Sequence, residues 1–131
     1  EPVSISGVQL QRQAVNGALI QLVTFVLAQN TATSFVPQSP IGLLHVFSHG
    51  ATGDPAASVL TYRADPVGYT QIVAKPGTSA VDVRQLTALT GTTGDPGEFT
   101  FSAHVDGRIY VENRLVGAPR TISLFVIGVP L

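Results

Sequence analysis

The sequence of 131 residues contains no cysteine and has few charged residues. Without cysteine, the chain cannot form a disulfide scaffold, a Cys-ligated iron–sulfur cluster or a thiolate zinc site. Charged residues make up 11% and hydrophobic residues 44% of the chain, whereas an average soluble protein has about 25% charged residues. This balance excludes a disordered chain, which requires low hydropathy and high charge.

An excess of basic residues and a long apolar run are also absent. The chain has 7 Lys and Arg residues and 8 Asp and Glu residues, so it is no candidate for nucleic-acid binding by phosphate neutralisation. The longest apolar stretch, residues 18–28, is interrupted by Gln21 and Thr24 and is shorter than the roughly 20 residues that span a bilayer. No basic segment opens the sequence, which begins with Glu1. We therefore expect no membrane insertion and no signal peptide, and a chain that is a fragment or was processed.

Turn signals divide the sequence into short segments. They include Asn16-Gly17, Asp65-Pro66, Pro76-Gly77, Gly94-Asp95-Pro96-Gly97 and Asp106-Gly107. The segments between them are rich in Val, Ile, Thr, Phe and Tyr, and helix-type Glu–Lys pairs are absent. This pattern predicts an all-β fold.

Seven further strands follow a predicted N-terminal hairpin. They cover residues 41–48, 58–64, 69–75, 80–89, 98–105, 108–114 and 121–129, whereas residues 30–40 are expected to form a polar loop. In the segment 98–105, alternation places Phe99, Phe101, Ala103 and Val105 inward and Thr100, Ser102 and His104 outward. About eight strands without a change of composition predict one domain, residues 1–131, folded as an antiparallel, jelly-roll-like β-sandwich.

The hairpin itself is predicted over residues 8–27, because Asn-Gly between alternating residues is a strong hairpin signal. Its second arm, like the closing segment 121–129, is apolar on both faces. One face of each can fill the sandwich, and the other requires a second cover. We therefore predict a subunit interface that includes Leu19, Val23, Phe25, Phe125 and Ile127.

A polar face is predicted on the strand after Asp106-Gly107. Asp106, Arg108, Tyr110, Glu112 and Arg114 share one parity there. Such a face is compatible with a solvated surface held by cross-strand ion pairs, a subunit interface or a sugar site. His45 and His49 would be about 13 Å apart on a strand, too far for one ion. We predict no catalytic residue, no metal site and no cofactor.

Several segments resemble small β modules of tailed-phage tail proteins. They are Leu89-Thr-Gly-Thr-Thr-Gly94, Phe99-Thr-Phe-Ser-Ala-His-Val-Asp-Gly107, Arg108-Ile-Tyr-Val-Glu-Asn-Arg114 and the strand Ile41-Gly-Leu-Leu-His-Val-Phe47. The resemblance covers residues 41–129 and implies a non-enzymatic virion surface protein. Such a protein would be a homotrimer on a tail fibre or spike that contacts other virion proteins and presents loops to a host-surface glycan.

Three other functions remain open. A head decoration protein would have a purely structural role, and a lectin-like domain would bind carbohydrate as a monomer. A small hydrolase would require two carboxylates about 5 to 10 Å apart across a cleft.

Overall fold

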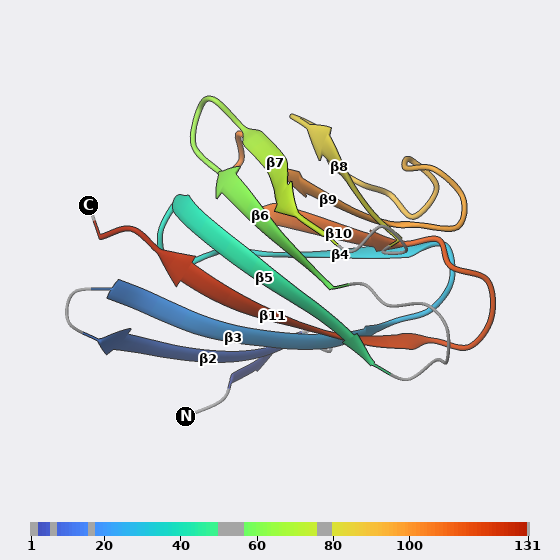
Figure 1. Ribbon diagram of the computed structural model, residues 1–131, viewed down its shortest axis with the longest axis horizontal. Helices are drawn as coiled ribbons and strands as arrows, with labels where there is room; N and C mark the ends of the chain where they lie inside the picture. The colour runs from blue at the N-terminus through green and yellow to red at the C-terminus, as the bar shows by residue number, and fades with distance from the viewer. Residues whose placement is uncertain (1–2, 6–7, 16–17, 50–56, 76–79, 131) are drawn as a thin grey trace.

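The computed structural model describes the backbone of residues 3–5, 8–15, 18–49, 57–75 and 80–130, and the side chains of residues 19–47, 57–75 and 80–130. Within these ranges the chain is all-β, with eleven strands in two sheets (Figure 1). The larger sheet contains, in spatial order, β1 (Val3–Ile5), β2 (Val8–Val15), β3 (Ala18–Leu27), β11 (Arg120–Gly128), β5 (Ile41–His49), β6 (Ser58–Arg63) and β7 (Tyr69–Ala74). The smaller sheet contains β4 (Thr31–Phe35), β10 (Ile109–Asn113), β9 (Phe99–Ala103) and β8 (Val81–Gln85). No helix of the described residues is long and apolar enough to cross a membrane.

The two sheets form a β-sandwich with a jelly-roll-like centre. β3 pairs with β11 in the larger sheet, and β4 pairs with β10 in the smaller one, all antiparallel. The chain therefore crosses from the larger to the smaller sheet between β3 and β4, and crosses back beside it between β10 and β11. This arrangement is the one that jelly rolls have. The chain departs from this pattern in the meander β5–β6–β7 and in the parallel pair β8–β9.

The predicted strands of the sequence appear in this fold. The hairpin over residues 8–27 is confirmed as β2 and β3, which pair from Gln9↔Thr24 to Val15↔Ala18; Asn16 and Gly17 lie outside the described residues. The nine predicted segments correspond to β2, β3 and β5 to β11, and β1 and β4 were not predicted, so the expected count of about eight strands was too low. β4 lies inside the expected loop 30–40, and its pairing with β10 along its whole length makes it a strand.

The core lies between the sheets. Its largest fully buried apolar side chains come from both layers: Tyr62, Leu44, Leu60, Ile122 and Leu124 from the larger sheet, and Phe99, Phe101 and Ile109 from the smaller one. Val105, predicted inward, is 48% exposed because β9 ends at Ala103.

The other face of β9 was also predicted incorrectly. Thr100 and Ser102 point away from the core, yet both are fully buried. The connection between β8 and β9, residues 86–98, crosses this outer face. Thr87 donates its backbone N–H to Ser102 Oγ at 3.1 Å, and a Cβ at Gly94 would lie 2.3 Å from Thr100 Oγ1. A loop therefore covers a face that alternation assigned to solvent.

Candidate functional site

The predicted interface residues do not share one face of the larger sheet. Val23 and Phe25 are 0% and 2% exposed and belong to the hydrophobic core, and Leu19 is half-buried. Phe125 and Ile127 lie on the outer face, each 37% exposed. The outward positions of β3 are the even-numbered ones instead, because antiparallel pairing places Phe125 opposite Leu22.

The outer face of β3, β11 and β5 carries a patch of exposed apolar side chains, which we call the apolar face. Its members are Leu22, Val26, Leu43, Phe47, Phe125 and Ile127. Pairing places Phe125 between Leu22 and His45 and Ile127 opposite Leu43, whereas Val26 and Phe47 lie opposite Thr121 and Ser123. Apart from the buried Arg120, the three strands contain no Asp, Glu, Lys or Arg. This is an uncharged surface of a kind that monomeric soluble proteins rarely expose.

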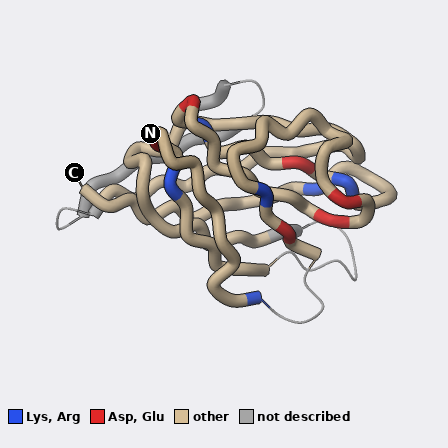
Figure 2. The backbone as a smooth tube through the Cα atoms, turned by 90° about the horizontal axis from the view of Figure 1, so that it is seen from above, with Lys and Arg blue, Asp and Glu red and all other residues tan. Residues whose placement is uncertain are grey.

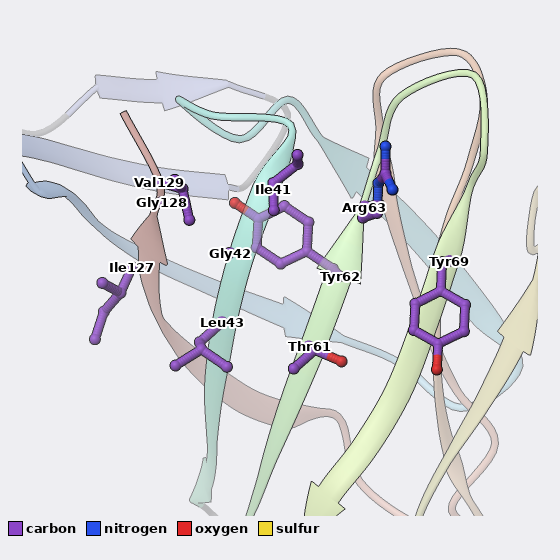
Figure 3. Close-up of a pocket in the computed structure, with 10 residues that line it drawn as sticks. All are labelled: Ile41, Gly42, Leu43, Thr61, Tyr62, Arg63, Tyr69, Ile127, Gly128 and Val129. Carbon is purple, nitrogen blue, oxygen red and sulfur yellow. The ribbon is translucent and has the colours of Figure 1, made fainter. Parts of the chain in front are cut away.

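An open pocket of about 420 Å³ adjoins the apolar face. Figure 3 shows the side chains of Leu43, Thr61 and Tyr69 beside one another on β5, β6 and β7. The remaining lining residues are Ile41, Gly42, Tyr62, Arg63, Ile127, Gly128 and Val129. This lining contains no carboxylate, and its mostly apolar chemistry suits an apolar group better than a sugar, which requires several hydrogen-bond partners.

Two paired glycines shape the edge of this pocket. Gly42 pairs with Gly128, and a Cβ on Gly42 would lie 2.2 Å from the backbone oxygen of Ile127. Beneath them, the buried Tyr62 donates its hydroxyl to the backbone oxygen of Ser39 at 2.8 Å. Burial raises the pKa of Tyr62 above its ordinary value, so this hydroxyl remains a donor.

The predicted polar face on the smaller sheet divides into exposed and buried parts. Asp106 and Arg108 are exposed, Tyr110 and Arg114 are half-buried, and Glu112 is 0% exposed. The Glu112 carboxylate accepts backbone N–H groups from Gly91 at 2.8 Å, Thr93 at 3.0 Å and Gly94 at 2.7 Å. Glu112 is therefore no surface residue: it holds the loop 86–98 against the sheet.

Arg114 also binds this loop. Its Nη1 donates to the backbone oxygen of Gly94 at 2.7 Å, and its Nε donates to Asn30 Oδ1 at 3.2 Å. Alternation alone treated the five residues of the polar face alike. In the structure, Glu112 and Arg114 make internal contacts with the loop 86–98. Alternation within a strand cannot predict which loop will cover a residue.

The exposed end of the polar face forms a hydrogen-bonded group, which we call the polar cluster: Ser34, His104, Asp106, Arg108 and Tyr110. Asp106 Oδ2 accepts the Tyr110 hydroxyl at 2.6 Å, and Asp106 Oδ1 accepts the Arg108 backbone N–H at 2.9 Å. Arg108 Nη1 donates to Ser34 Oγ at 3.3 Å. The His104 and Tyr110 rings meet edge to face, with centroids 5.8 Å apart.

Two pKa shifts accompany these contacts. Partial burial raises the pKa of Asp106. The hydrogen bonds from Tyr110 and the Arg108 backbone lower it by more than burial raises it, so the pKa of Asp106 is below its usual value. The hydrogen bond to Asp106, followed by burial, raises the pKa of Tyr110. Both shifts keep Asp106 ionised and Tyr110 protonated at neutral pH.

A third group contains the carboxylates of Asp82, Asp95 and Glu98, whose oxygen atoms lie within 4.8 Å of one another. Arg84 bridges two of them, with ion pairs to Asp82 at 2.7 Å and Asp95 at 3.1 Å. Burial and the Asp82 charge raise the pKa of Glu98. Figure 2 shows several acidic and basic residues toward one end of the molecule and others spread along the rest of the chain. Arg84 compensates Asp82 and Asp95, and the charges of Lys75 and Arg84 both act to lower the pKa of Glu98.

Comparison of the chain with protein-family models, with curated proteins and with solved structures gave no match.

Proposed function

We propose that this chain is a structural module of a phage virion surface, which assembles as a homotrimer and presents its loops to a host-surface glycan. The observation that carries the proposal is the apolar face. Six large apolar side chains are between 37% and 60% exposed there. They lie on three adjacent strands in which no charged residue faces outward.

The absence of charge on this face favours a second copy of the same chain as the partner. Close to a three-fold axis, equivalent residues of neighbouring subunits approach one another, so a charged residue there would meet its own like charge. The hydroxyl groups of Thr24 and Ser123, on the same two strands, form a hydrogen bond with each other at 3.2 Å. Burial of the apolar face would make the interface resemble a protein core cut in half, as in permanent oligomers.

The virion location rests on the resemblance of residues 41–129 to phage tail modules. A head decoration protein would use the same apolar face for assembly, so binding to isolated capsids rather than to host cells would favour that role. The lectin-like alternative has its own observation, the polar cluster, and would be favoured by a monomer that binds sugar.

The oligomeric state of the chain tests this proposal. Light scattering after size-exclusion chromatography should give three times the chain mass, and Val26→Asp should give a folded monomer, because it introduces three like charges into the interface. Val73→Asp is the matched control: Val73 is 59% exposed and Val26 60%, but Val73 lies on the edge strand β7, outside the apolar face. A wild-type monomer at micromolar concentration, or equal effects of the two variants, would contradict the proposal.

A further inference from the structure

The polar cluster has an unequal supply of hydrogen-bond donors and acceptors. Both carboxylate oxygens of Asp106 already accept hydrogen bonds, from the Tyr110 hydroxyl and the Arg108 backbone. His104 Nδ1 accepts the Asp106 backbone N–H at 3.2 Å and also lies 3.3 Å from Asp106 Oδ1, so this ring nitrogen is used within the chain. The acceptors of the cluster are therefore used within the chain.

The donors of the same cluster are largely unused. Arg108 makes no ion pair with a carboxylate among the described residues, and its side chain donates one hydrogen bond there, to Ser34. A guanidinium group has five N–H donors in a planar arrangement that matches a carboxylate. An acceptor-rich ligand would complement this surface better than a donor-rich one.

The backbone holds these donors in place. The turn from His104 to Arg108 is closed by hydrogen bonds from the His104 N–H to the Arg108 oxygen at 2.9 Å and from the Gly107 N–H to the His104 oxygen at 3.1 Å. Gly107 has a φ of 87°, which L side chains rarely adopt. Tyr110 lies on β10, directly opposite Ser34 on β4, so a sheet supports its ring.

We infer that the polar cluster binds an acidic saccharide. The sugar carboxylate would pair with Arg108, with the Ser34 hydroxyl as a further donor. The apolar side of the sugar ring would lie against Tyr110, as aromatic rings suit amphipathic ligands. This inference deepens and rests on the proposed function, since it names the kind of glycan that the module would contact.

Glucuronic acid and glucose are a matched pair of probes, because they differ only in the oxidation of one carbon. Saturation-transfer NMR on the full chain should detect glucuronic acid, with affinity at least about tenfold higher than for glucose, as a charge-assisted pair predicts. Arg108→Gln should reduce the affinity for glucuronic acid by about tenfold or more. Lys75→Gln removes one positive charge elsewhere, near Val81, and should leave binding unchanged.

Tyr110→Ala provides a second variant with a separate readout. It should lower the affinity for both sugars, while the circular dichroism spectrum and the mass from light scattering remain as in the wild type. If the oligomer dissociates instead, this face is an interface and the inference is wrong. Equal binding of glucose and glucuronic acid, equal affinity of Arg108→Gln and wild type, or no binding of either sugar would also overturn it.

The same samples separate this inference from the proposed function. A trimer that binds neither sugar overturns only the saccharide site. A monomer that binds glucuronic acid through Arg108 keeps the site and overturns the trimeric module.

Discussion

On the outer face of the smaller sheet, polar side chains are buried, whereas on the outer face of the larger sheet, apolar side chains are exposed. Thr100, Ser102 and Glu112 are 0% exposed because the loop 86–98 covers them. Val26 and Phe47 are 60% and 45% exposed. A loop of the same chain thus covers the outer face of the smaller sheet. No segment in the described part of the chain covers the apolar face.

The difference follows from what each kind of residue requires. A buried carboxylate is costly unless hydrogen bonds replace its water, and the N–H groups of Gly91, Thr93 and Gly94 do this for Glu112. An apolar face requires only the exclusion of water, which any complementary apolar surface achieves. A loop of specific geometry therefore belongs to the polar side, and a second subunit suits the apolar one.

The largest expected effect separates the two faces of β11. Leu124 is fully buried, and Phe125, its neighbour in sequence, lies on the apolar face. Leu124→Asp should lower the free energy of unfolding by more than about 3 kcal/mol or abolish folding, because it buries an unpaired charge. Phe125→Asp should fold and fail to assemble. Circular dichroism with light scattering measures both outcomes, and a folded, assembled Leu124→Asp variant would refute the inward placement of this side chain.

A somewhat smaller effect is expected where the loop meets the smaller sheet. Glu112→Gln should lower the free energy of unfolding by roughly 2 to 4 kcal/mol, because the new amide group would face backbone N–H donors in a buried site. Urea denaturation at pH 7 measures this loss.

Glu98→Gln is the control for this variant. Burial and the Asp82 charge raise the pKa of Glu98, so the folded state disfavours its ionised form at neutral pH. Removal of that charge should therefore cost no stability. Equal losses for the two variants would mean that Glu112 does not anchor the loop.

The smallest expected effect concerns the polar cluster. The folded state lowers the pKa of Asp106, so its contribution to stability is present above the unfolded pKa, about 4, and is lost as pH falls through the folded pKa. Tyr110→Phe removes one of the hydrogen bonds that lower this pKa. NMR titration should then give a higher Asp106 pKa, with less than about 1 kcal/mol of stability lost at pH 7. An unchanged Asp106 pKa would contradict the role of the Tyr110 hydroxyl.

Much of the fold could be predicted from local signals. Asn16-Gly17 located the hairpin because few other dipeptides accept positive φ at both turn positions. Alternation located β9 and placed Phe99 and Phe101 correctly in the core. β4 was missed because its sequence, Thr31–Phe35, is polar, and its strand conformation depends on a partner strand far along the chain, where Asn113 pairs with Thr31, 82 residues earlier.

The candidate site was predictable only in part. The shared parity of Asp106, Arg108 and Tyr110 identified the polar cluster, but no local pattern indicated that Ser34, from another strand, would join it. Glu112 has the same parity and is buried, because whether a loop covers a position is not encoded in alternation.

The sequence by itself determined the all-β class, the strand periodicity and the excess of apolar residues in β3 and β11, since these depend on turn chemistry and local alternation. Only the tertiary structure decided which face of each doubly apolar strand points inward. A strand with two apolar faces fits a core equally well in either orientation, and pairing with neighbours breaks that tie. Val23 and Phe25 therefore lie in the core, and Leu22 and Val26 lie on the surface that we propose as the subunit contact.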